Sequence, residues 1–506
     1  MKIITNKIIP KFIVAFLFHS NIVFAQESVL FHGLKQGQYN VGYKTNWVFD
    51  YQRTWDNGPR PIRMNIWYPA EKSNQNKMLF ERYVLSDPPN MKWLIYRDLL
   101  RRRDIGDSTK SLKGLYSGSE ELYESLLTTP TNAVENASPL NGKFPVVVYS
   151  LGQNDYSEEN TILFEYLASN GFIVIAVPQV GISSRKANLM IDDELSFETQ
   201  VRDLEFAISK IYTLSYADDT KVAAAGMSMG GVYALLAAMR NNTIRLLIGL
   251  DPSFIWTYES YGYKYWNSKY YDEWNLKIPM VILQRADTGE KNDYTILDKL
   301  KFSKREVVKY PNLIHSDFTS YPMFTANAPK DKVDKYALGR RNQQIAIKGY
   351  QEICQTVLKA LRKYLYNNPD EVITDRKGAL QLSGIQAPNE EEFCKIIQKE
   401  GISTALQVYT QASAKYPADT IIRLKKLNRI GFEYYLDKNY KMAIGIYTLC
   451  TRAYPGSSDA FENLGEMYLY NGDEKEALKN FKKSLELDPN NKDAQQMLNK
   501  LNKQSL

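Results

Sequence analysis

The feature that most constrains the fold is a regular alternation between residues 144 and 366. Short continuous apolar runs, too short for buried helices, alternate there with longer amphipathic segments of helical period. The apolar runs occupy 144–149, 172–177, 222–225, 244–250, 278–283 and 306–310, and the helical segments 158–169, 197–214, 232–240 and 341–366. Strands without polar alternation are buried on both faces. The pattern therefore predicts an α/β fold with a mainly parallel sheet that helices cover on both sides.

The region before residue 144 does not show this regular alternation. Residues 62–69 alternate and stop at Pro69, which predicts a strand. Residues 73–140 are irregular, with a helix-like span at 91–103, and we interpret them as an inserted cap. We expect one catalytic domain to extend over 26–370, with a linker at 371–388.

A 34-residue period governs the C-terminal region, where no strand pattern remains. The matched pairs are Gly431 and Gly465, Tyr434 and Tyr468, Ala443 and Ala477, Tyr447 and Phe481, and Pro455 and Pro489. A fainter earlier copy uses Ala405, Tyr409, Ala412 and Pro417. These positions resemble the helix–turn–helix units of tetratricopeptide repeats. We expect about three repeats and a capping helix over 389–506, which either bind a protein partner or serve packing and self-association.

The rarity of cysteine and histidine excludes several site types. The chain has three residues of each kind, too few for a disulfide framework or a four-cysteine zinc site, and it has no H-E-x-x-H motif. The net charge of +7 comes from 64 basic and 57 acidic residues without a long single-sign run, so nucleic-acid binding is not indicated. We predict no metal and no cofactor.

The N-terminus has the plan of an export signal. Three lysines precede an apolar core at 12–18, and small residues stand at Val23 and Ala25. The core breaks at His19, well short of the roughly 20 apolar residues that a membrane-spanning helix needs. We expect a signal peptide at 1–25, cleavage after Ala25, a periplasmic or secreted product, and no stable membrane span.

One motif carries chemistry. Gly226-Met227-Ser228-Met229-Gly230 has the form G-x-S-x-G, and it follows a predicted strand and opens a predicted helix. A serine on such a sharp turn stands clear of the sheet, and glycines avoid clashes on both sides. Ser228 is the candidate nucleophile.

A serine needs a base, and histidine is the usual one. Only His32 and His315 remain after removal of the signal, and only His315 follows the sheet strands. Two aspartates at strand ends, Asp251 and Asp287, could orient it. Position alone does not choose between them, since a carboxylate after a strand is also common in turns.

The residues around these candidates resemble the α/β-hydrolases of the plasma platelet-activating-factor acetylhydrolase and dienelactone hydrolase branch. The matching segments lie within about 38–320 and read Arg60-Pro61-Ile62, Ile66-Trp67-Tyr68-Pro69-Ala70, Pro145-Val146-Val147-Val148-Tyr149-Ser150, Gly226-Met227-Ser228-Met229-Gly230-Gly231, Gly249-Leu250-Asp251, and His315 with Asp317-Phe318. The resemblance implies the α/β-hydrolase fold. It also implies Asp251 as the acid, whereas other α/β-hydrolases place the acid one strand later, which corresponds to Asp287.

The oxyanion hole requires two backbone N–H groups. Met229, the residue after the nucleophile, is the first candidate donor. The resemblance implies Gln153 as the second, in Ser150-Leu151-Gly152-Gln153. Here Leu151 replaces the histidine that the family carries, which leaves open how the loop is hydrogen-bonded.

Together these observations predict an exported serine hydrolase that cleaves carboxylic esters through an acyl-enzyme. The resemblance implies short acyl or phospholipid-like esters. Two alternatives stay open: an interaction protein with a hydrolase-like scaffold, and a peptidase or acyltransferase that uses the same triad, because one triad serves several chemistries.

Overall fold

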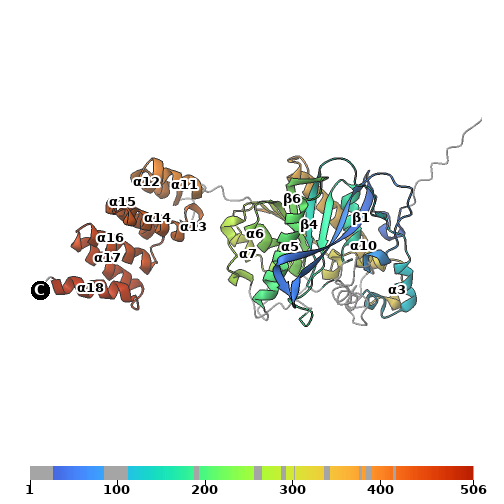
Figure 1. Cartoon of the computed structure of the whole chain (residues 1–506), viewed down its shortest axis with the longest axis horizontal. Helices are drawn as coiled ribbons and strands as arrows, with labels where there is room; N and C mark the ends of the chain where they lie inside the picture. Colours follow the sequence, from blue (N-terminus) through green and yellow to red (C-terminus); the bar gives the residue numbers. More distant parts are fainter. Residues whose placement is uncertain are drawn as a thin grey trace, which may run out of the picture. The chain divides into compact units, whose positions relative to one another are not determined.

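The computed structural model (Figure 1) divides the chain into two compact units. The sheet unit comprises Met1–Tyr271, Ile278–Ile296 and Arg305–Gln381, and the helical unit comprises Asp272–Lys277, Leu297–Lys304 and Leu382–Leu506. The structure describes residues 27–84, 112–153, 155, 158–186, 193–255, 265–286, 292–300, 302–334, 342–374, 379–382, 390–413 and 418–504. The predicted signal peptide, the helix-like span 91–103, Asp287 and Pro417 lie outside these residues. The predicted boundaries of domains and linker stay predictions.

A ten-stranded sheet forms the centre of the sheet unit, in the order β10-β9-β8-β7-β6-β4-β5-β2-β1-β3. The six strands from β4 to β9 are mutually parallel, and the long β1–β2 hairpin adds antiparallel to β5. The strands are β1 (Asn40–Trp55), β2 (Gly58–Ala70), β3 (Ala133–Glu135), β4 (Phe144–Ser150), β5 (Ile173–Val177), β6 (Ala217–Met227), β7 (Ile244–Leu250), β8 (Met280–Arg285), β9 (Arg305–Tyr310) and β10 (Leu380–Leu382).

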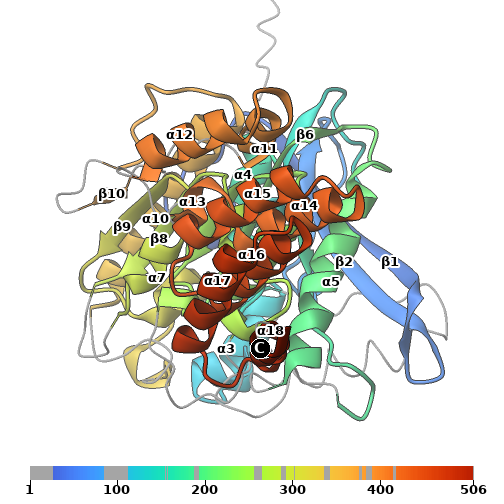
Figure 2. The same ribbon diagram turned by 90° about the vertical axis from the view of Figure 1, so that its left-hand side faces the viewer.

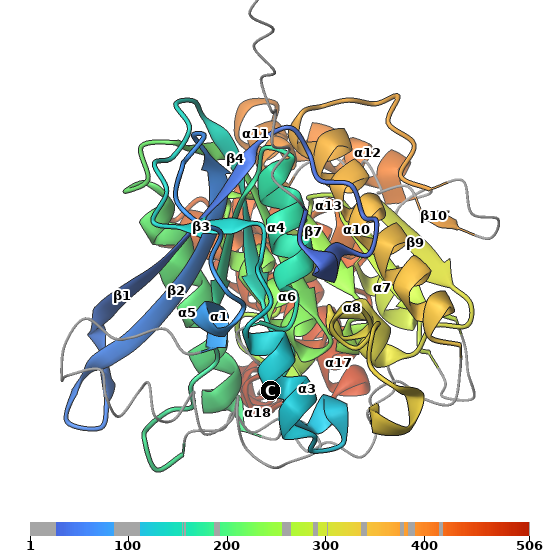
Figure 3. The ribbon, with the colours of Figure 1, turned by 90° about the vertical axis from the view of Figure 1, so that its right-hand side faces the viewer.

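Helices cover both faces of this sheet, because each parallel strand needs a crossover connection. α4 (Thr161–Ser169) and α10 (Gln343–Leu365) pack together on the face seen in Figure 3, and α5 (Glu194–Ile211) and α6 (Met229–Arg240) pack together on the other. Every residue of β4, β5 and β8 is buried. The predicted fold class, a mainly parallel α/β sheet followed by paired helices, is confirmed.

Shorter elements complete the sheet unit. They are η1 (Val29–Phe31), α1 (Glu81–Val84), η3 (Gly114–Tyr116), α3 (Glu120–Leu127), η4 (Ser253–Ile255), η5 (Tyr265–Asn267), η7 (His315–Phe318), α8 (Tyr321–Phe324) and η8 (Lys330–Lys332). η6 (Glu273–Asn275) lies in the helical unit, and α7 (Thr295–Lys299) spans a boundary between the units. The predicted cap, 73–140, contributes β3, which pairs in parallel with β1. Its role as a lid stays a prediction.

The helical unit is a run of paired helices, in which α14 to α18 each pack on the next (Figure 2). Its helices are α11 (Glu390–Lys399), α12 (Ile402–Ser413), α13 (Ala418–Ile421), α14 (Leu424–Leu436), α15 (Tyr440–Ala453), α16 (Ser458–Tyr470), α17 (Glu474–Leu487) and α18 (Lys492–Gln504). The periodic residues explain the pairing. A Cβ added at Gly431 would lie 2.7 Å from the Tyr447 ring, and one at Gly465 2.8 Å from the Phe481 ring. Glycine thus lets each aromatic ring reach the facing helix.

A buried carboxyl, Glu165 on α4, makes the stability of the sheet unit depend on pH. Its oxygens accept hydrogen bonds from the Tyr83 hydroxyl and the Asn132 N–H, each at 2.8 Å. Burial nevertheless raises the pKa of Glu165 from 4.5 to about 7. Between these two values the folded chain keeps a proton that the unfolded chain loses, so the free energy of unfolding falls as pH rises.

We predict that Glu165→Gln weakens this pH dependence, because glutamine is neutral at every pH. The wild-type protein should lose on the order of 3 kcal/mol of stability through this group between pH 4.5 and 7, at about 1.4 kcal/mol per pKa unit. Urea unfolding followed by tryptophan fluorescence at pH 5 and pH 8 measures the difference. If the free energy of unfolding falls by the same amount between pH 5 and pH 8 in wild type and in Glu165→Gln, the prediction is contradicted.

Candidate active site

The nucleophile candidate sits where β6 ends and α6 begins. Ser228 has φ +54°, a left-handed conformation that a non-glycine residue adopts only under local constraint. The flanking glycines are required by close backbone contacts. A Cβ at Gly226 would lie 2.3 Å from the carbonyl carbon of Gly230, and one at Gly230 would lie 2.2 Å from the carbonyl oxygen of Ser150. The structure thus forms the tight strand–turn–helix that the motif predicts.

The acid and base candidates meet across two loops. Asp251 follows β7 and is completely buried, and His315 begins η7 after β9. His315 Nδ1 lies 2.6 Å from Asp251 Oδ2, and the histidine side chain is 32% exposed. This arrangement fixes one ring nitrogen on the carboxylate and leaves the other, Nε2, for chemistry. His32 is engaged elsewhere, since its Nε2 lies 3.0 Å from the carbonyl oxygen of Met323.

The nucleophile backbone is hydrogen-bonded to residues on both sides of Asp251. The Ser228 N–H donates to the Leu250 carbonyl (3.0 Å), and the Ser253 N–H donates to the Ser228 carbonyl (2.9 Å). The Ser228 hydroxyl lies 3.3 Å from the Ser253 hydroxyl.

Two residues at this site were missed by the sequence reasoning. Arg285, at the end of β8, donates its backbone N–H to Asp251 Oδ1 (3.1 Å), and its Nε lies 3.3 Å from Oδ2. Ser253 lies beside the nucleophile. Arg285 reaches Asp251 because β7 and β8 pair in parallel, which sets Leu250 opposite Leu283 and brings the ends of both strands together.

The candidate oxyanion donors occupy the two expected loops. Met229 is the first residue of α6. Gln153 follows Leu151 and Gly152 in the loop after β4. This loop touches the turn that holds the nucleophile, because a Cβ at Gly230 would lie 2.4 Å from the Leu151 carbonyl oxygen. Leu151 is completely buried, so the side chain at this position belongs to the core.

Comparisons with known proteins find hydrolase-like sequence in this part of the chain. The family model for chlorophyllase matches residues 120–256, a range that includes Ser228, Asp251, Met229 and Gln153. Chlorophyllase type 0 of Chenopodium album is 30% identical over 122 residues, which are 22% of this chain and 35% of that protein. This part of the chain is chlorophyllase-like. The chain thus spans about a third of the length of the curated relative that it matches.

The chlorophyllase-like match ends at residue 256 and does not cover His315, the candidate base that the structure places against Asp251. Among solved structures, a ferulic acid esterase from Streptomyces cinnamoneus aligns with a TM-score of 0.49 at 19% identity, covering 68% of this chain and 97% of that one.

A second match lies in the helical unit. The tetratricopeptide repeat model matches residues 458–491, which hold α16 and α17. Over the described ranges, no helix has both the length and the apolar character that a membrane crossing requires.

Proposed function

We propose that this protein is a serine hydrolase that cleaves carboxylic esters, with Ser228 as nucleophile, His315 as base and Asp251 as the group that orients the base. The observation that carries the proposal is the 2.6 Å contact between His315 and the buried Asp251, next to the turn that holds Ser228. The chlorophyllase-like sequence from 120 to 256 supports the same reaction class.

The reaction follows from the roles of these groups. His315 Nε2 takes the proton as Ser228 Oγ attacks the ester carbonyl, and the Met229 and Gln153 N–H groups receive the resulting oxyanion. The tetrahedral intermediate then expels the alcohol, which takes the proton from His315, and an acyl-enzyme remains. Water attacks this ester as His315 takes its proton; the second tetrahedral intermediate then releases the acid and expels Ser228 Oγ, which takes the proton back from His315. Asp251 stabilises the imidazolium in both halves.

The substrate is proposed from the resemblance and from the relatives. Short acyl esters and phospholipid-like esters, as cleaved by platelet-activating-factor acetylhydrolases, are the first class. The curated relative is a chlorophyllase, so chlorophyll belongs in the same test. We further propose export to the periplasm or medium with removal of residues 1–25, and binding of a protein partner or self-association through the tetratricopeptide-like helices.

The test is a substrate series on the purified full-length chain. We expect hydrolysis of p-nitrophenyl acetate and butyrate, with kcat/KM falling toward palmitate, and chlorophyll as a parallel probe. A rate that rises toward palmitate, or selective cleavage of chlorophyll, would replace the short-acyl assignment. No turnover of any ester would contradict the esterase proposal and favour the interaction-protein alternative.

A further inference from the structure

Two buried polar side chains form hydrogen bonds to one peptide unit beside the candidate active site. The unit joins Leu151 to Gly152, directly before the residue whose N–H is the proposed second oxyanion donor. Its carbonyl oxygen accepts a hydrogen bond from Gln179 Nε2 at 2.7 Å. Its N–H donates to Glu159 Oε2 at 2.8 Å. Glu159 and Gln179 are both completely buried, so each hydrogen bond is shielded from water.

This peptide unit lies against the turn that carries the nucleophile. The Leu151 carbonyl oxygen would be 2.4 Å from a Cβ at Gly230, two residues after Ser228. Because successive peptide units share a Cα atom, the orientation of the Leu151–Gly152 unit restricts the orientation of the Gly152–Gln153 unit. This second unit carries the N–H of Gln153. A donor contributes to an oxyanion hole only if it points at the developing charge.

The surroundings of Glu159 disfavour the ionised form of its carboxyl group. Burial, and next the neighbouring Asp155 carboxylate, raise the pKa of Glu159 well above its ordinary value, against the opposing hydrogen bonds from Gly152 and Tyr149. The Tyr149 hydroxyl lies 3.3 Å from Glu159 Oε1, and Asp155 accepts a hydrogen bond from the Tyr321 hydroxyl at 2.5 Å. A neutral carboxyl still accepts from the Gly152 N–H through one oxygen.

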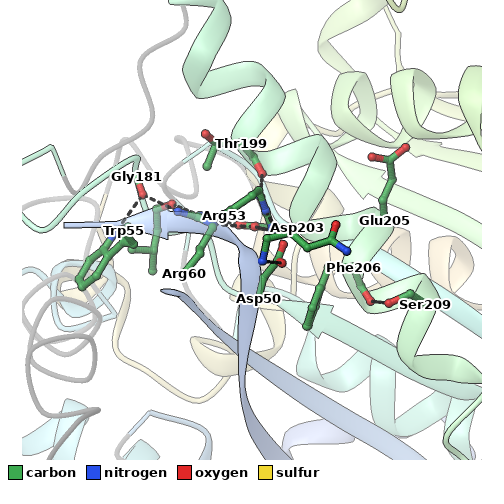
Figure 4. Close-up of polar contacts among 12 residues, drawn as sticks. Asp50, Arg53, Trp55, Arg60, Gly181, Thr199, Asp203, Glu205, Phe206 and Ser209 are labelled. Atoms are coloured by element: carbon green, nitrogen blue, oxygen red, sulfur yellow. Dashed lines mark hydrogen bonds and ion pairs between the residues drawn. The ribbon is translucent and has the colours of Figure 1, made fainter. Parts of the chain in front are cut away.

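The segment that carries Gln179 is itself anchored, as Figure 4 shows for Gly181. Arg60 donates to the Val180 carbonyl (2.7 Å) and the Gly181 carbonyl (3.0 Å). The same guanidinium makes a bidentate ion pair with Asp203 on α5, at 2.6 and 2.7 Å. Arg60 is 2% exposed, so a rigid buried pair fixes the loop next to Gln179.

Glu159 also connects to the segment that carries the histidine. The Ser320 N–H donates to the Glu159 backbone carbonyl at 2.8 Å, and Asn160 Nδ2 donates to the Phe318 carbonyl at 3.1 Å. Ser320 and Phe318 both belong to the stretch that begins at His315. Residues 159–160 therefore form hydrogen bonds both to the loop of the proposed oxyanion donor and to the segment that begins at His315.

We propose that Glu159 and Gln179 are positioning residues that hold the Leu151–Gly152 peptide unit and so aim the Gln153 N–H at the oxyanion. The inference rests on the proposed function and extends it to how the second donor is oriented. It also shows how the backbone at Leu151 and Gly152 is hydrogen-bonded with a leucine at position 151: side chains from two neighbouring segments bind it.

The test compares kcat and KM for p-nitrophenyl acetate in three variants of the full-length chain. Glu159→Leu removes the acceptor of the Gly152 N–H and of the Tyr149 hydroxyl, and Gln179→Leu removes the donor to the Leu151 carbonyl. Glu159→Gln keeps an acceptor for Gly152 without a charge. We expect kcat to fall by about 10- to 100-fold in both leucine variants with KM within about threefold, since complete loss of a donor costs about 100- to 1,000-fold. Glu159→Gln should stay within about threefold of wild type.

Titration with a fluorophosphonate separates positioning from folding, because it counts competent serines. A purely structural role would lower the number of labelled serines and leave kcat per labelled serine unchanged, which would overturn the inference. A Glu159→Gln variant as slow as Glu159→Leu would overturn it too. If neither leucine variant folds, Glu159→Asp, which draws the carboxyl back from Gly152, carries the same expectation as Glu159→Leu. Absence of turnover and labelling in wild type would instead refute the proposed function.

Discussion

Alanine at position 228 should lower kcat for ester hydrolysis by about 10⁴- to 10⁶-fold and leave the fold intact. The loss is large because no acyl-enzyme can form without the hydroxyl, and only the oxyanion donors and substrate binding remain. The fold should persist, since Ser228 is held by backbone hydrogen bonds to Leu250 and Ser253 that alanine retains. Steady-state kinetics with p-nitrophenyl acetate and a thermal unfolding curve measure both.

Ser253 supplies the matched control for this variant. Its hydroxyl lies 3.3 Å from that of Ser228, so it shares the same surroundings, but it does not stand on the strained turn. Ser253→Ala should cost less than about tenfold in kcat, because the hydrogen bond to Ser228 that it removes is neutral and worth about 1 kcal/mol. A reversed pair of results, with Ser253→Ala inactive and Ser228→Ala active, would assign the nucleophile to Ser253.

The substitution Asp251→Asn should lower kcat at neutral pH by about 10⁴-fold. The asparagine side chain would keep the shape of the aspartate, but its amide cannot stabilise the imidazolium, and a donor N–H facing His315 Nδ1 selects the wrong tautomer. The completely buried carboxylate also faces Arg285 at 3.3 Å. We therefore expect Asp251→Asn to lower the unfolding temperature too, since one partner of a buried ion pair is lost.

Asp287→Asn is the comparison that decides between the two aspartates. The sequence left both positions open, and the structure brings Asp251 to 2.6 Å from His315 while Asp287 lies outside the described residues. We predict less than about tenfold loss of kcat in Asp287→Asn. A loss of about 10⁴-fold there, with Asp251→Asn near wild type, would move the acid to the later strand.

The sequence predicted those features that rest on local patterns. The G-x-S-x-G spacing and the apolar runs on either side located the turn at Ser228, because glycine contacts and buried strands leave a direct mark on the sequence. The 34-residue period likewise predicted the repeated helix pairs, and the structure adds that Gly465 meets the Phe481 ring within one pair. Repeats can be recognised in a sequence because each unit packs on its neighbours through the same positions.

Contacts between distant segments could not be predicted in this way. Arg285 reaches Asp251 only because β8 pairs with β7, and Gln179 reaches the Leu151 carbonyl only because β5 lies beside β4. Neither residue belongs to a motif. Glu159 reads as an ordinary helix-start carboxylate in sequence, and its burial and its bond to Gly152 depend on the packed fold. These contacts of Arg285, Gln179 and Glu159 can therefore be recognised only in the folded structure.

The central claim, that Ser228 is an activated nucleophile, is tested most directly by mapping a covalent adduct. The full-length chain is treated with a fluorophosphonate at neutral pH, digested, and analysed by mass spectrometry. We predict one phosphonylated residue, Ser228, with labelling lost in Ser228→Ala and strongly slowed in Asp251→Asn. An adduct on another serine, or none on a folded wild-type chain, would contradict it.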